Sequence, residues 1–205
     1  MPLELRDDER GNMARCAVGE GLFGTGMGLI SVVTVLPILL EKYLGAGEVE
    51  LGLAFSLGTA GWLLAQPLGM LGLARRRRTK RFLVPWAFGF AVPSYLAMGA
   101  AVYLLGVGRP RLCSGIVLGL LAVRILGGGA ATPLWFDWQA MIFRRGIRGL
   151  AIGMMAGASA AGASLAAVAS AGARLTLPFP LNFSLLFCAA VVFFAAGLSV
   201  FASVR

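Results

Sequence analysis

One arginine lies where a charged side chain is costly. Arg124 interrupts the apolar stretch 112–136, which contains no other charged residue. Counted from Leu112 it lies about 18 Å along a helix, close to the middle of a bilayer. A charge at that depth costs about 2.5 kcal/mol or more, so Arg124 is the leading candidate for binding an anionic substrate or for coupling. The alternative is a structural arginine bonded to backbone carbonyls that nearby glycines open.

Three other side chains in apolar stretches are candidates for the same site. Glu20 lies near the start of the first stretch, either in a cavity or at the water interface. Trp62 and Gln66 lie in the second, either lining a cavity or packing between helices. The chain has no histidine, which excludes Ser-His and Cys-His dyads, and its three cysteines show no metal-ligand spacing. We expect no enzymatic activity, no metal and no cofactor.

Long apolar runs must position these residues. Of the 205 residues 59% are hydrophobic and 13% charged, about half the charged fraction of soluble domains. About 20 apolar residues cross a bilayer as a helix, the structure that satisfies its own backbone in lipid. We predict an all-α membrane protein with one domain, 1–205. Its six transmembrane helices are expected at about 17–40, 51–74, 82–106, 112–138, 149–173 and 181–203.

Basic residues are divided unequally between the two ends of these helices. With a cytoplasmic N-terminus, thirteen lie inside and four outside. The inner ones are Arg6, Arg10, Arg15, Arg75, Arg76, Arg77, Arg78, Lys80, Arg81, Arg144, Arg145, Arg148 and Arg205, and the outer ones Lys42, Arg109, Arg111 and Arg174. The positive-inside rule therefore predicts that both termini are cytoplasmic. The same rule accounts for the net charge of +9, so we expect no nucleic-acid partner.

Glycines and prolines mark particular helices. Residues predicted to bend the fourth helix are Gly127, Gly128, Gly129 and Pro133. The first helix is also glycine-rich, with Pro37 expected to kink its outer end, and the third and sixth are bulky. This similarity of the first helix to the fourth and of the third to the sixth is typical of a three-plus-three inverted repeat. The segment 149–173 is rich in Gly, Ala and Ser, so it should pack closely against protein.

Four segments together point to a known family. They are the basic loop GMLGLARRRRTKR (69–81), Leu120-x-x-x-Arg124-x-x-Gly127-Gly128, Asp137 followed by Arg144, Arg145, Arg148 and Gly149, and PFPLNFSLLF (178–187). Over residues 15–203 the chain resembles the N-terminal six-helix half of a major facilitator superfamily transporter. The last segment resembles a group of bacterial members. Leu73 departs from the pattern, because the family has a carboxylate at that place in the basic loop.

The resemblance implies a secondary carrier of the bacterial inner membrane that moves a small solute by alternating access. It also implies that Arg124 corresponds to an arginine linked to proton coupling in drug antiporters. A full transporter has about twelve helices, so six would be a half-size unit that needs a second half. That half is a second copy or a partner chain, facing the second and fifth helices. The alternatives are a non-transporting scaffold or assembly protein and an inactive fragment.

A gate is expected at the cytoplasmic end. We predict that Asp137 pairs with an arginine run in one state and releases it in the other, which would bias a two-state equilibrium. The run consists of Arg75, Arg76, Arg77 and Arg78. Its alternative role is to determine topology and to contact anionic lipids.

Overall fold

The computed structural model describes residues 6–73 and 79–204, which form helices and short connections with no strand among them. The elements are α1 (Asp7–Leu29), α2 (Val35–Ile38), η1 (Leu39–Tyr43), α3 (Glu48–Ser56), η2 (Leu57–Gly61), α4 (Trp62–Leu73), α5 (Thr79–Leu105), α6 (Pro110–Ile142), α7 (Arg145–Thr176) and α8 (Leu181–Ser203). Five segments in these residues are long and apolar enough to cross a membrane: Glu48–Leu71, Arg81–Leu105, Pro110–Ile142, Arg145–Thr176 and Leu181–Ser203. The predicted all-α class is confirmed for these residues, and the five segments are compatible with a multi-pass membrane protein. The count of six transmembrane helices and the inverted repeat stay predictions.

The first predicted helix, 17–40, is the one that the structure corrects. Helix α1 begins earlier, at Asp7, and ends at Leu29. The chain turns before α2, and the backbone N–H groups of Val35 and Leu36 donate to the Ser31 carbonyl. A proline has no backbone N–H and crowds the carbonyl four residues before it in a helix, so Pro37 favours a break here, although α4, α5 and α6 continue through internal prolines. The result is a break rather than a kink, and α1 is not among the five candidate spans.

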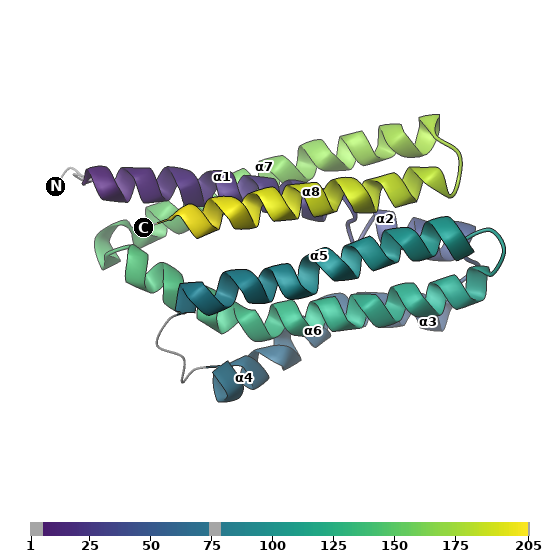
Figure 1. The fold of residues 1–205 in the computed structure, drawn as a ribbon, viewed down its shortest axis with the longest axis horizontal. Helices are drawn as coiled ribbons and strands as arrows, with labels where there is room; N and C mark the ends of the chain where they lie inside the picture. Colours follow the sequence, from purple (N-terminus) through teal and green to yellow (C-terminus); the bar gives the residue numbers. More distant parts are fainter. Residues whose placement is uncertain (1–5, 74–78, 205) are drawn as a thin grey trace.

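The helices form two groups that meet through α5 and α8 (Figure 1). In one group α1 packs against α7 and α8, and in the other α6 packs against α4 and α5. The junction is aromatic, because the Tyr95 and Phe194 rings stack with centroids 5.0 Å apart. Phe23 of α1 meets Phe194 edge-on at 4.8 Å. These rings bury the centre of the bundle.

Helices α1 and α7 approach closely because small residues face each other. A Cβ at Gly24 would meet the carbonyl oxygen of Ser159, and one at Gly162 would meet that of Gly21. Small residues allow this separation in membrane helices. The prediction that 149–173 packs closely against protein is therefore confirmed for the face toward α1, while the opposite face of α7 is exposed.

Both ends of the described chain lie at the same end of the bundle (Figure 1). The connection from α6 to α7, with Arg144, Arg145 and Arg148, lies at that end too. The connections from α5 to α6 and from α7 to α8 lie at the other end. The arginine-rich connection and the termini therefore share one side, as the charge pattern predicts.

Candidate functional site

Arg124 is buried in the centre of the bundle with only 5% of its surface exposed. Its Nη2 donates to the Met27 sulfur at 2.9 Å. Its guanidinium carbon lies 5.7 Å from the centroid of the Trp62 ring and 5.3 Å from that of Tyr95. Among residues 6–73 and 79–204 it makes no ion pair and no hydrogen bond to a backbone carbonyl. The alternative role, a structural arginine bonded to backbone carbonyls, is therefore wrong for the described residues.

The surroundings of Arg124 stabilise a cation without neutralising it. The faces of aromatic rings attract a guanidinium, by about 0.5–2 kcal/mol each. A thioether sulfur is a weak acceptor and carries no charge. The site therefore keeps its full positive charge, which an anionic ligand can pair with by charge-assisted hydrogen bonds.

Arg124 forms part of the wall of a pocket of about 700 Å³. The wall comes from α1, the turn after it, α3, η2, α4, α6 and α7. Its lining residues are Met27, Gly28, Ser31, Val32, Val33, Thr34, Phe55, Gly58, Thr59, Trp62, Arg124, Ile125, Ala163, Ser164 and Ala167. Hydroxyl groups of Thr34, Thr59 and Ser164 lie on its exposed part. We call this the Arg124 pocket, and its volume suits a small solute.

Two interruptions of regular helix border the Arg124 pocket, whereas a third, the π-helix η1, does not. One is the turn at 30–34, from which four consecutive residues line it. The other is the π-helix η2, Leu57–Gly61, which contributes Gly58 and Thr59. π-helical turns inside α-helices are frequently found at functional sites. Two segments of irregular backbone therefore lie beside the buried charge.

Glycines of α6 make room for the Trp62 ring. A Cβ at Gly128 would lie 2.6 Å from Cζ3 of that ring, and one at Gly129 would lie 2.9 Å from the Ala65 Cβ. Gly127 is covered by the Phe90 ring in the same way. Helix α6 continues unbroken from Pro110 to Ile142. The structure thus gives these glycines a packing role that the sequence analysis missed, and bending at Gly127, Gly128, Gly129 and Pro133 stays a prediction.

A second pocket, of about 340 Å³, shares Trp62 with the first. Its lining residues are Glu20, Phe23, Trp62, Leu83, Val84, Ala87, Gly128, Ala131, Thr132, Trp135, Phe136, Leu198 and Phe201. Glu20 is half-buried and is its one charged lining residue. We call this the Glu20 pocket. The structure therefore brings Trp62 to both pockets but divides Arg124 and Glu20 between them.

Two other predicted residues lie outside both pockets. Gln66 is half-buried on α4 and lines neither of them. Asp137 is exposed near the end of α6. Its predicted partners Arg75, Arg76, Arg77 and Arg78 lie outside the described residues, so the predicted gate pairing stays a prediction.

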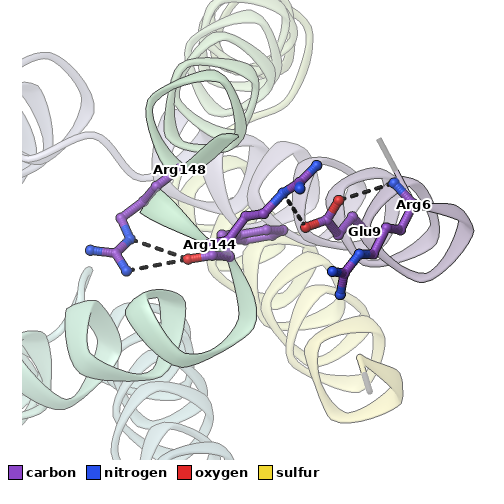
Figure 2. Close-up of polar contacts among 5 residues, drawn as sticks. Arg6, Glu9, Arg144 and Arg148 are labelled. Carbon is purple, nitrogen blue, oxygen red and sulfur yellow. Dashed lines mark hydrogen bonds and ion pairs between the residues drawn. The ribbon is translucent and has the colours of Figure 1, made fainter. Parts of the chain in front are cut away.

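A different ion pair links the helices at the arginine-rich end. Glu9, with a side chain 8% exposed, pairs with Arg144 Nε at 2.9 Å, and its other oxygen accepts a hydrogen bond from the Arg6 backbone N–H at 3.0 Å (Figure 2). Arg148 Nη2 donates to the carbonyl oxygens of Ala140 at 2.9 Å and Phe143 at 3.2 Å, which caps the end of α6. These contacts tie the start of α1 to the connection between α6 and α7. The sequence signal was the acidic residue at the third helical position, which is typical of a capping box.

No protein-family model, curated protein or solved structure matches the chain. The resemblance to the major facilitator superfamily therefore rests on the four sequence segments alone.

Proposed function

We propose that this protein is a half-size membrane carrier that binds the anionic group of a small solute at Arg124 and moves it by alternating access. One observation carries the proposal: a buried guanidinium with no carboxylate partner in the described chain faces a pocket of about 700 Å³. A charge in that position is costly unless it is paired. A ligand anion is the partner that the pocket has room for.

The order of helix packing supports the proposal of an inverted repeat. In such a repeat α1, α4 and α5 correspond to α6, α7 and α8. The contact between α1 and α7 then corresponds to that between α6 and α4, and the contact between α1 and α8 to that between α6 and α5. The contact between α5 and α8 is exchanged with itself. Repeats of this kind place binding sites near the middle of the membrane, between helices with interrupted backbone. The interruptions at 30–34 and 57–61 have that position relative to the Arg124 pocket.

Exposure supports a second half. The two least buried candidate spans are Glu48–Leu71 and Arg145–Thr176. Thr59 and Ser164, on the exposed part of the Arg124 pocket, belong to these two spans. The hydroxyls of Thr59 and Ser164 donate to the carbonyl oxygens of Phe55 and Ala160, so they do not require cover by themselves. A guanidinium in a pocket that opens to lipid is unfavourable, so we propose that a second copy covers this side. Both copies would lie in a bacterial inner membrane with the arginine-rich end in the cytoplasm.

Binding and transport of an anion test the proposal. Benzenesulfonate is a suitable probe, since its sulfonate can pair with Arg124 and its ring with Trp62 and Phe55. We expect it to bind the purified chain and to accumulate in vesicles reconstituted with it, and Arg124→Met to weaken binding by about tenfold or more. The matched control is Arg111→Met, at an exposed arginine of the same helix. Equal binding by both variants would refute the anion site, and binding without saturable flux would favour a non-transporting protein.

A further inference from the structure

The Glu20 pocket differs chemically from the Arg124 pocket. Its wall is apolar and aromatic apart from one carboxylate and the hydroxyl of Thr132. Five aromatic rings line it: Phe23, Trp62, Trp135, Phe136 and Phe201. The Trp135 and Phe201 rings meet edge-on at 4.6 Å, so two of these rings support each other in place. Aromatic side chains from α1, α4, α6 and α8 thus line one partly open pocket.

Glu20 has no cation beside it in the described chain. It makes no ion pair or hydrogen bond among residues 6–73 and 79–204. The nearest arginine along its helix, Arg15, donates instead to the carbonyl oxygen of Ser203 at 3.5 Å. Arg124 lines the other pocket and is not part of this wall. The carboxylate therefore lacks the partner that a half-buried charge normally has.

Both features of the Glu20 pocket select a cation with an apolar body. The faces of aromatic rings attract ammonium groups, and quaternary ammonium ligands are recognised by cages of such rings. A carboxylate adds direct attraction to the same charge. A strongly hydrated inorganic cation is disfavoured, because aromatic carbons cannot replace its water, and an anion is repelled by Glu20.

We propose that the Glu20 pocket is a second binding site, specific for an organic cation that carries an aromatic or bulky apolar group. The ammonium group lies beside Glu20, and the apolar group lies among the aromatic rings. The site is distinct from the proposed anion site, since Trp62 is the one lining residue that the two pockets share.

Binding of benzyltrimethylammonium to the purified full-length chain tests this proposal. Its uncharged carbon analogue, neopentylbenzene, has nearly the same shape, so the difference between the two isolates the charge. Changes in tryptophan fluorescence report occupancy, because Trp62 and Trp135 line the pocket. We expect the wild-type protein to bind the cation at least tenfold more tightly than the analogue. Equal affinity for the two compounds, or no binding of either, would overturn the proposal.

Variants assign the binding to this pocket. We expect Glu20→Gln to weaken benzyltrimethylammonium binding at least tenfold and to leave benzenesulfonate binding unchanged. The matched control is Glu41→Gln, which removes an exposed carboxylate and should change neither affinity. Arg124→Met should show the opposite selectivity, losing the sulfonate and keeping the cation. Unchanged cation binding in Glu20→Gln would overturn the proposal. A wild-type protein that binds the cation but not benzenesulfonate would refute only the anion site.

Discussion

Replacing Arg124 by methionine should stabilise the protein while removing its anion binding. Methionine has a similar length and no charge, and it fills irregular apolar space. Arg124 is 5% exposed and its described partners are a thioether and two rings, so the substitution leaves no buried carboxylate unpaired. This distinguishes it from breaking a buried ion pair, which is strongly destabilising.

The magnitude follows from two opposing contributions. A central arginine costs roughly 2.5–3.5 kcal/mol in a membrane helix. The contacts of the guanidinium with the Tyr95 and Trp62 rings, at 5.3 and 5.7 Å, stabilise it by about 1 kcal/mol each. Removing both contributions leaves a net stabilisation of about 1 kcal/mol, which for a chain of this length raises Tm by roughly 2–4 °C.

The assay is thermal unfolding in detergent, measured beside benzenesulfonate binding. Arg111→Met is the control, and since Arg111 is exposed on the same helix its unfolding free energy should change by less than about 0.5 kcal/mol. A Tm that falls by several degrees in Arg124→Met would mean that the guanidinium holds the fold together. That result would refute the reasoning that this charge is kept for a ligand.

Two further predictions concern packing and the ion pair. Gly162→Ala should lower Tm, because its Cβ would lie 2.7 Å from the Thr25 hydroxyl and against the α1 backbone. The control is Gly172→Ala in the same helix, whose Cβ would meet nothing within 4 Å and which should not lower Tm. Equal Tm values for the two variants would contradict the close contact. Glu9→Ala should destabilise the protein by about 1–2 kcal/mol in chemical unfolding, since it removes a cap and a half-exposed ion pair. Asp8→Ala, an exposed carboxylate in the same turn, is its control, and an equal effect of the two changes would refute the role of the pair.

Helix positions were largely predictable because hydropathy is a local property and a bilayer sets the length of each span. The segments predicted at 82–106, 112–138, 149–173 and 181–203 match α5 to α8 within four residues at each end. The second, 51–74, matches α3 to α4 but contains a π-helix that apolar composition does not reveal. The first failed because a break inside a long uncharged run does not change its hydropathy, and prolines elsewhere in the chain lie within continuous helices.

The charge of Arg124 and its place in the middle of a long apolar segment could be read from the sequence alone, because both depend on one segment. Its partners could not, since Met27 is 97 residues away along the chain and reaches it only through the packing of α1 near α6. The same holds for Trp62, whose ring fits over Gly128 and which lines both pockets. Sequence thus determined which charges lie within apolar segments. Tertiary structure decided that they lie in separate pockets, because side-chain neighbours are set by helix packing and not by position along the chain.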